Sequence, residues 1–254
     1  MDTMSDPVSR FSNRVEAYVK YRPTYPSEVV SYLGEKVGLT PEWIIADVGC
    51  GPGISSKIFL ENGNRVIGIE PNDAMREAAA EYLADYDRFE MVAGRSDETT
   101  LGDHSVDIVM AAQAFHWFEP QPTRREFDRI RRPGAPIMLM WNLRQETTTA
   151  FLVEYELFIQ RWSSDYHIVK HNNIGDDEVQ AFLGEDCEKA VFPNKQVLDL
   201  EGVRGRIVSS SYMPHEGSEA YKPMIAALRE LFAKHAVADR IEILYDTIVY
   251  TSHT

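Results

Sequence analysis

The chain lacks most of the features that mark secreted scaffolds, nucleic-acid binders and membrane proteins. Its two cysteines, Cys50 and Cys187, are too few and too scattered for a disulfide framework or a metal cluster, so no metal site is expected. With 26 basic against 40 acidic side chains the formal net charge is −14, which removes any general attraction for phosphate backbones or anionic membranes. No apolar run approaches the ~18 residues of a membrane span, and residues 1–14 contain no apolar signal core. We therefore expect a cytoplasmic protein that neither inserts into membranes nor binds nucleic acid.

One dense basic cluster departs from this acidic character. It holds five arginines, Arg124, Arg125, Arg129, Arg131 and Arg132. The residues between them have the pattern of a surface helix, so a solvated helix face is favoured over a polyanion site.

Short apolar runs alternate with helical patterns from residue 43 to residue 142. Strands are predicted at 43–49, 65–70, 89–94, 106–113 and 136–142, with helices at 54–63, 73–86 and 122–132. In the second helix Met75, Ala79 and Tyr82 fall on one face, behind a possible cap at Asn72 or Asp73. This alternation is typical of βαβ units in a parallel sheet.

The regular alternation of strand and helix patterns ends at residue 142. A helix at 150–162 has no strand directly behind it, and a strand at 191–200, helices at 201–210 and 218–235, and a strand at 240–252 complete the chain. We predict three units, which are an N-terminal helical lid segment (1–40), a sheet domain (41–142 and 187–254) and an inserted helical cap (143–186).

The loop after the first strand carries the strongest functional signal. The sequence "DVGCGPGISS" spaces Gly49, Gly51 and Gly53 two apart in front of a helix, so bare backbone and unpaired N–H groups can meet a ligand. Taken alone, the trio also suits a tight structural turn. Glu70 favours the ligand interpretation, because it ends the next strand 17 residues past Gly53, where an acid can bind ribose hydroxyls.

The type of nucleoside follows from two further positions. Ile54 stands where a dinucleotide fingerprint has its third glycine, which argues against a pyrophosphate. Asp47, just before the loop, suits a ligand with a positive amino group. The sequence therefore favours a cationic nucleoside cofactor.

Several segments resemble the class I S-adenosylmethionine-dependent methyltransferases. The resemblance lies in "DVGCGPG", "GIEPNDAM" and "RRPGAPIMLMWN", and the "HWF" at 116–118 is similar to a type 11 subgroup that includes trans-aconitate methyltransferase-like proteins. The terminal stretches "YVKYRPTYP", "VSSSYMP" and "YDTIVYTS" resemble the same subgroup. The resemblance implies an α/β, Rossmann-like sheet of seven strands, six parallel and the last antiparallel, flanked by helices with a cap after strand five. It also implies that S-adenosyl-L-methionine is converted to S-adenosyl-L-homocysteine.

The resemblance assigns cofactor contacts position by position. Arg95 stands where an aspartate or a small polar residue is usual, so Asp97, with the backbone of Ser96, is the candidate for the adenine. The remaining cofactor contacts expected are Tyr18, Arg22, Asp47, Gly49, Cys50, Gly51, Gly53, Glu70, Pro71, Met75 and Gln113.

The segment from Gln113 to Trp117 follows the fourth strand, at the carboxyl edge where ligands of open α/β sheets bind. His116 and Gln113 are the candidate catalytic residues, and His116 either acts as a base or only forms part of the pocket wall. Trp117, Trp141 and Arg144 are the candidate acceptor contacts. For Trp117 ordinary packing, and for Arg144 a surface ion pair, are the alternatives.

These features predict a methyltransferase that acts on a small-molecule acceptor by in-line displacement in a dry pocket. A carboxylic acid is one candidate acceptor, and lipids or quinones are equally open. A nicotinamide-dependent oxidoreductase and a non-catalytic cofactor sensor are the competing hypotheses. The sequence does not determine the oligomeric state.

Overall fold

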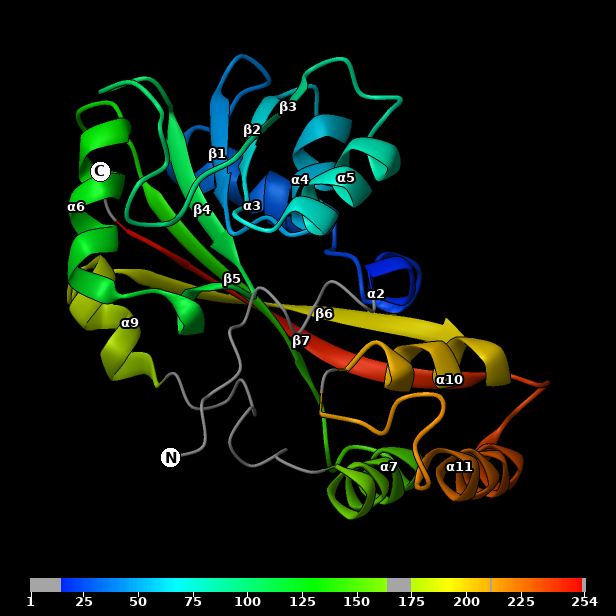
Figure 1. The fold of residues 1–254 in the computed structure, drawn as a ribbon. Helices are drawn as coiled ribbons and strands as arrows, with labels where there is room; N and C mark the ends of the chain where they lie inside the picture. Colours follow the sequence, from blue (N-terminus) through cyan, green and yellow to red (C-terminus); the bar gives the residue numbers. More distant parts are fainter. Residues whose placement is uncertain (1–14, 164–174, 211, 253–254) are drawn as a thin grey trace.

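The computed structural model describes residues 15–163, 175–210 and 212–252, which form one seven-stranded sheet with helices around it (Figure 1). The strands are β1 (Ile44–Val48), β2 (Arg65–Ile69), β3 (Phe89–Val92), β4 (Ile108–Ala112), β5 (Ile137–Arg144), β6 (Glu188–Leu198) and β7 (Ile241–Thr251). Their order is β3-β2-β1-β4-β5-β7-β6, and β7 runs antiparallel to both neighbours. The predicted sheet, with six parallel strands and an antiparallel last strand, is confirmed.

Three helices cover one face of the parallel strands. They are α3 (Glu28–Val37), α4 (Ile54–Glu61) and α5 (Asp73–Tyr82). Val29 and Leu33 of α3 and Phe59 of α4 are fully buried in a core with the sheet residues that point to this face. Because α3 packs on the sheet, part of the segment predicted as a lid belongs to the core.

Two helices cover the opposite face. α6 (Pro120–Ile130) buries Phe127 and Ile130, and α9 (Asp176–Leu183) buries Phe182 against the same core. α9 lies within the predicted cap segment 143–186, but its contacts are with α6 and this face of the sheet.

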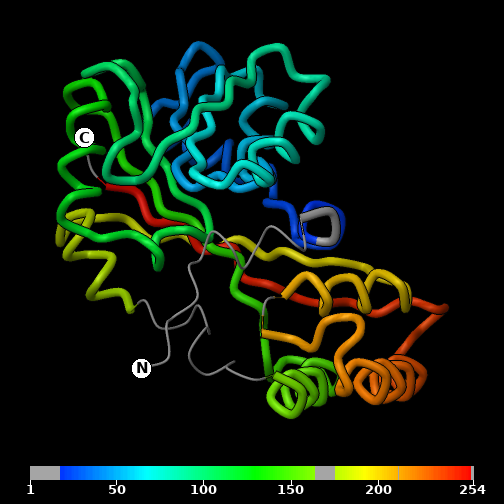
Figure 2. Tube along the Cα trace, in the orientation of Figure 1, coloured from blue at the N-terminus to red at the C-terminus, as the bar shows by residue number. Residues whose placement is uncertain are grey.

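The last two strands extend beyond the others at the carboxyl edge. β6 pairs with β7 from Glu188↔Thr251 to Leu198↔Ile241, whereas β5 leaves β7 at Arg144↔Tyr245. The overhang carries α7 (Ala150–Trp162), α10 (Leu200–Val208) and α11 (Tyr221–His235), whose apolar side chains form a third cluster with the start of β7. Figure 2 shows these helices beyond the main sheet. The helices above the carboxyl edge thus come from two segments, 150–162 and 200–235.

Some element boundaries differ from the predictions. β4 begins at Ile108 rather than Val106, because Val106 forms only an isolated bridge to Arg131 and the Asp107 carboxylate accepts from the Ile44 N–H at 2.8 Å. β6 begins three residues earlier than predicted, at Glu188. Among the described residues, no helix combines the length and apolar character needed to cross a membrane.

Gly205 allows α10 to pack closely against α2 (Val15–Tyr21), because it has no side chain. A Cβ at Gly205 would lie 2.1 Å from Cε2 of Tyr21. We expect Gly205→Ala to lower the free energy of unfolding by ~1–3 kcal/mol through overpacking, although alanine favours helices. Urea unfolding followed by circular dichroism measures the change.

Gly34→Ala on α3 is the matched control, since a Cβ there meets its nearest neighbour at 3.7 Å. Its helix propensity should raise stability by ~0.5–1 kcal/mol. Adding Tyr21→Ala should recover part of the Gly205→Ala loss. Equal changes in the free energy of unfolding for Gly205→Ala and Gly34→Ala would contradict the close packing of α10 on α2.

Candidate functional site

The glycine loop folds between β1 and α4 with all three glycines in the left-handed region. Gly49, Gly51 and Gly53 have φ of 69°, 55° and 81°. The Gly49 N–H donates to the Ile69 carbonyl at 2.8 Å, which fixes the loop to the end of β2. Cys50 is buried, and its Sγ would lie 2.8 Å from a Cβ at Gly68, so the loop also packs closely on β2.

The three glycines are required for different reasons. A Cβ at Gly49 would lie 2.7 Å from Cβ of Ala114, and one at Gly53 would lie 2.5 Å from Cδ1 of Leu83. A Cβ at Gly51 would meet no atom of the described residues within 4 Å. Gly51 therefore faces open space, which a ligand can occupy.

Asp47 is a buried carboxylate with unused hydrogen-bonding capacity. Its Oδ2 accepts from the hydroxyls of Ser55 and Ser56, both at 2.7 Å. Its Oδ1 is buried and has no hydrogen-bond partner among the described residues. Burial raises the pKa of Asp47 to about 6, although the two serine bonds oppose the shift. Such an oxygen suits a cationic ligand group.

Glu70 follows β2 and lies beside the same loop. Its carboxylate accepts from the Gly51 N–H at 3.1 Å and from the Asn72 N–H at 2.9 Å. Burial raises the pKa of Glu70, opposed by these two bonds and by Arg76. The carboxylate is held next to the open space at Gly51.

The start of α5 completes this side of the site. Asn72 caps the helix by accepting from the Met75 N–H at 3.1 Å, and Met75 is buried. Pro71 is exposed, and its carbonyl accepts from Arg76 at 2.8 Å. The structure thus brings Asp47, Glu70 and Met75 together around the glycine loop.

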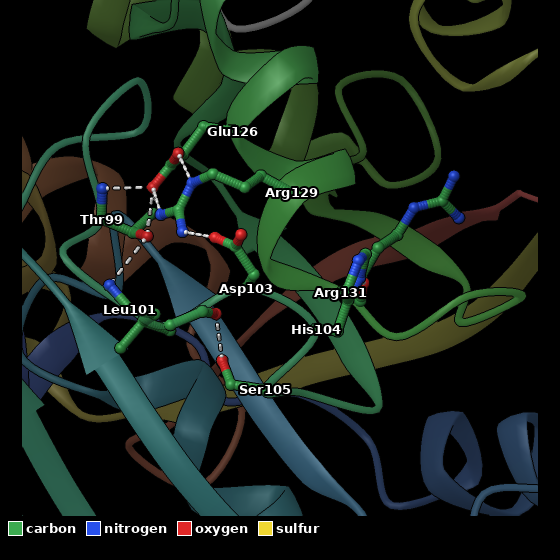
Figure 3. A network of polar contacts seen from close by, with 9 residues as sticks. Thr99, Leu101, Asp103, His104, Ser105, Glu126, Arg129 and Arg131 are labelled. Atoms are coloured by element: carbon green, nitrogen blue, oxygen red, sulfur yellow. Dashed lines mark hydrogen bonds and ion pairs between the residues drawn. The ribbon is translucent and has the colours of Figure 1, made fainter.

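A network of polar contacts around the buried residues Glu126 and Thr99 holds the loop that follows β3 (Figure 3). Glu126 of α6 accepts from the Thr99 N–H at 2.8 Å and from Arg129 Nη2 at 2.7 Å, and Arg129 reaches Asp103 at 2.6 Å. Burial would raise the pKa of Glu126, but the bonds from Arg129 and Thr99 outweigh it and lower the pKa to about 2. Glu126 stays ionised and fixes the loop on α6.

The candidate adenine residues lie in this anchored loop with partners of their own. Ser96 Oγ accepts from Thr123 at 2.9 Å, and the Asp97 carboxylate is paired with Arg95 at 3.1 Å. Arg95 stands where the resemblance leads us to expect an aspartate or a small polar residue. Its ion pair partly neutralises Asp97, the residue predicted to bind the adenine instead.

Gln113 ends β4 in a strained conformation. Its φ is 56°, unusual for a residue other than glycine. The side-chain amide donates to the Asn142 carbonyl at 3.0 Å, and its Oε1 is buried with no partner among the described residues. The strain turns the chain out of the sheet, with an unused acceptor at the carboxyl edge.

His116 and Trp117 belong to the short 3-10 helix η2 (Phe115–Trp117) that follows Gln113. Burial lowers the pKa of His116 to about 4, so the ring is neutral at physiological pH. The Trp117 ring stacks at a tilt with its centroid 4.7 Å from that of His116, and Trp117 is 41% exposed. Solvent or an acceptor can therefore reach Trp117.

Trp141 lies in the core rather than in an open site. Its ring packs edge-on against Phe115 and Tyr250, with centroids 6.4 and 5.8 Å away. Trp141 points to the face of β5 opposite that of Asn142 and Arg144. A direct contact of Trp141 with an acceptor stays a prediction.

The remaining predicted residues lie at the end of β5 and on the N-terminal segment. Arg144 pairs with Glu156 of α7. Arg22 lies over the Tyr18 ring at 4.6 Å and donates to the Ser209 carbonyl at 3.2 Å. Sequence analysis missed Asn142, Glu156 and Arg206, because only the pairing of distant segments brings them to this edge.

Four of the five arginines of the basic cluster on and after α6 pair with carboxylates. Arg124 and Arg131 pair with Asp128, Arg129 pairs with Glu126 and Asp103, and Arg132 pairs with Asp107. These pairs favour the structural interpretation of the cluster over a polyanion site.

The sheet order, the glycine loop and the acid after β2 agree with the resemblance of the sequence to class I S-adenosylmethionine-dependent methyltransferases. In agreement, residues 46–139 match the family model described as a methyltransferase domain. This segment runs from β1 to β5 and includes every element around the glycine loop.

The chain is also similar to individual proteins that are described as methyltransferases. An uncharacterized methyltransferase of Mycobacterium tuberculosis is 33% identical over 140 residues, which is 54% of this chain and 53% of that protein. The chain thus spans about half the length of the mycobacterial relative. A methyltransferase-like protein of Schizosaccharomyces pombe is 23% identical over 95% of this chain and 94% of its own. A solved structure of a candidate type II methyltransferase from Anaeromyxobacter dehalogenans shares the fold, with a TM-score of 0.63. The match covers 92% of this chain and 98% of that chain, and the two sequences are 22% identical.

The raised pKa of Asp47 predicts a pH dependence for cofactor binding. If the ionised carboxylate meets the amino group of S-adenosylhomocysteine, affinity should increase as the pH rises through about 6. Below that pKa, each pH unit should weaken binding up to about tenfold. Isothermal titration calorimetry across this pH window measures the effect.

Asp47→Asn should abolish the pH dependence and weaken binding at neutral pH. The pKa of Asp47 is higher in the folded protein than in the unfolded chain. The ionised carboxylate therefore lowers the stability of the folded protein above pH ~6, and this cost disappears as the pH falls below 6 and the carboxyl group is protonated. Asp47→Asn should therefore raise the melting temperature of the ligand-free protein at neutral pH. An unchanged pH profile in Asp47→Asn would exclude Asp47 as the titrating group.

Proposed function

We propose that the protein transfers a methyl group from S-adenosylmethionine to a small-molecule carboxylic acid. The observation that carries the cofactor assignment is the buried Oδ1 of Asp47, which lacks a hydrogen-bond partner among the described residues beside the glycine loop. A buried carboxylate oxygen without a donor is costly, and a ligand ammonium group relieves that cost.

The residues around the loop fit this cofactor. Asp47 would bind the amino group, the open space at Gly51 would take the methionine chain, and Glu70 would accept from the ribose hydroxyls in place of its present backbone donors. Cys50, Gly49, Gly53 and Pro71 shape the loop, and Met75 would pack against the adenine. Ser96 and Asp97 remain the proposed adenine partners.

S-adenosylmethionine would supply an electrophilic methyl group attached to a positively charged sulfur. Gln113 and His116 follow β4 at the carboxyl edge, and their role is to orient the acceptor and exclude water. A carboxylate is already ionised at neutral pH, since its ordinary pKa is ~4, so its methylation needs no general base. The lowered pKa of His116 agrees with a neutral wall residue.

The competing functions make different demands on the site. An oxidoreductase with a dinucleotide would need space for a pyrophosphate where Ile54 is buried at the start of α4. A sensor would bind the cofactor without transfer, so assays of labelled methyl transfer to small acids, phenols and lipids separate it from the proposed enzyme.

A matched pair of glycine variants tests cofactor binding. Gly51 and Gly134 have φ of 55° and 78°, and a Cβ at either meets no described atom within 4 Å. Gly51→Ala and Gly134→Ala should therefore carry similar backbone strain, about 1 kcal/mol. Only Gly51→Ala should lose the rise in melting temperature that S-adenosylhomocysteine gives the native protein.

NAD is the negative control in the same thermal-shift experiment. Stabilisation by NAD and not by S-adenosylhomocysteine would refute the proposed function. Equal loss of binding in both glycine variants would show that strain, not occupation of the space at Gly51, explains the effect.

His116→Ala tests the type of acceptor. For a carboxylate acceptor, loss of a wall residue should lower kcat less than about tenfold and leave the Kd for S-adenosylhomocysteine unchanged, whereas loss of a general base costs ~10²–10⁴-fold. Labelled methyl transfer to the best acid of the panel gives kcat.

His215→Ala, at an exposed histidine, is the matched control. With a His116 pKa of about 4, kcat/KM for the acid, measured at saturating S-adenosylmethionine so that Asp47 does not contribute, should show no titration of His116 near pH 6.5. A fall of more than a hundredfold in His116→Ala would mean that His116 removes a proton, which would contradict a carboxylate acceptor.

A further inference from the structure

Three arginines from distant segments gather beside one small pocket at the carboxyl edge. The pocket has about 230 Å³ of empty space, including the part open to solvent. Its lining includes Arg144, Tyr155, Arg206 and Ser210. Arg22 lies next to it, because its Nη2 donates to the carbonyl of Ser209. We call Arg22, Arg144 and Arg206 with this lining the arginine pocket.

The positive charges of the arginine pocket are only partly balanced. Glu156 pairs with Arg144. Among the side chains of residues 18–163, 175–210 and 212–252, no carboxylate lies within 4.0 Å of a guanidinium nitrogen of Arg22 or Arg206. Arg206 donates to neutral hydroxyls, those of Tyr245 and Ser210, both at 3.3 Å. Two guanidinium groups therefore have no acidic partner among the described side chains.

Burial makes this imbalance costly. The Nε of Arg22 is buried and has no hydrogen-bond partner among the described residues. Burial lowers the pKa of Arg22, and the positive charge of Arg206 lowers it further. The pKa of Arg206 is raised despite its burial, because Tyr245 and Tyr155 stabilise its charge, so the penalty falls on Arg22. Arginine does not deprotonate in proteins, so two like charges stay close together in a poorly solvated site. An anion placed between them would remove this penalty.

The arginine pocket lies on the acceptor side of the proposed methyl-transfer site. Arg144 is two residues beyond Asn142 on the same face of β5, and the Asn142 carbonyl accepts from Gln113 at the end of β4. The glycine loop follows β1, which is two strands away from β5, or ~10 Å. The pocket is therefore next to the end of β4 and separated from the glycine loop.

We propose that the arginine pocket binds a carboxylate of the methyl acceptor. This inference rests on the proposed function and adds the site that selects and orients the acceptor. Guanidinium forks bind carboxylates with two parallel hydrogen bonds, which fixes orientation as well as charge.

Thermal shift of the protein saturated with S-adenosylhomocysteine tests the proposal. The probes are succinate, the neutral succinamide and inorganic phosphate, at constant ionic strength. Succinate should raise the melting temperature, and succinamide should not. Arg206→Met should weaken the apparent succinate affinity about 10- to 100-fold, because a hydrogen bond to a charged group is lost. Arg206→Lys should retain an intermediate affinity, since it keeps the charge but loses the fork.

Arg125→Met is the matched control, because Arg125 is exposed on α6 and its loss changes the net charge equally. It should leave the succinate response unchanged. S-adenosylhomocysteine affinity, measured separately for Arg206→Met, should equal that of the native protein.

Each contrary outcome has a separate meaning. If S-adenosylhomocysteine does not bind the native protein, the proposed function fails. If it binds but succinate has no effect, or acts equally on Arg206→Met, the proposal for the arginine pocket is wrong while the function stands. Stabilisation by phosphate and not by succinate would overturn the carboxylate assignment. Loss of S-adenosylhomocysteine affinity in Arg206→Met would assign the pocket to the cofactor's own carboxylate instead.

Discussion

Antiparallel pairing of β7 with both β5 and β6 is the constraint on which the site depends. It places β6 and β7, from the last third of the chain, in one sheet with strands that the chain completed by residue 144. Asn142 lies where these segments meet. Its side-chain oxygen accepts hydrogen bonds from Thr247 and Asn194, and its side-chain nitrogen donates to the Thr24 carbonyl. Its backbone carbonyl accepts from Gln113. One amide thus joins the N-terminal segment, β4 and both late strands at the edge where ligands bind.

The local patterns of the sequence were sufficient for the first half of the sheet. Strand and helix periods located β1 to β5, and the glycine spacing located the loop around Gly51, because these depend on neighbours in the chain. The arginine pocket could not be predicted in the same way, since Arg22, Arg144 and Arg206 are joined only by long-range packing. Sequence alone could not tell that His116 is largely buried, and its ordinary pKa near 6.5 therefore suggested a base. The role of each site residue in binding stays a prediction.

The costly features of the fold concentrate at the carboxyl edge. Asp47 is buried with a pKa of about 6, Gln113 has a φ of 56°, and Arg22 keeps a buried nitrogen without a partner among the described residues. Elsewhere the buried charges are satisfied, as Glu126 is by Arg129 and Thr99. The chain can therefore satisfy buried charges, and their imbalance at this edge agrees with sites that a cation and an anion complete.

The net charge of −14 opposes an anionic acceptor at long range, yet the proposed pocket attracts it at short range. These two effects act over different distances, because salt screens exposed charges beyond ~8 Å at physiological ionic strength. Arg22 and Arg206 are partly buried, so their attraction is screened less than that of exposed charges. The acidic surface then slows the approach of all anions. An acid that fits between the guanidinium groups gains affinity from contacts that a larger anion, or one of another shape, cannot make. Selectivity for the acceptor would therefore come from the geometry of the arginine pocket rather than from the overall field of the protein.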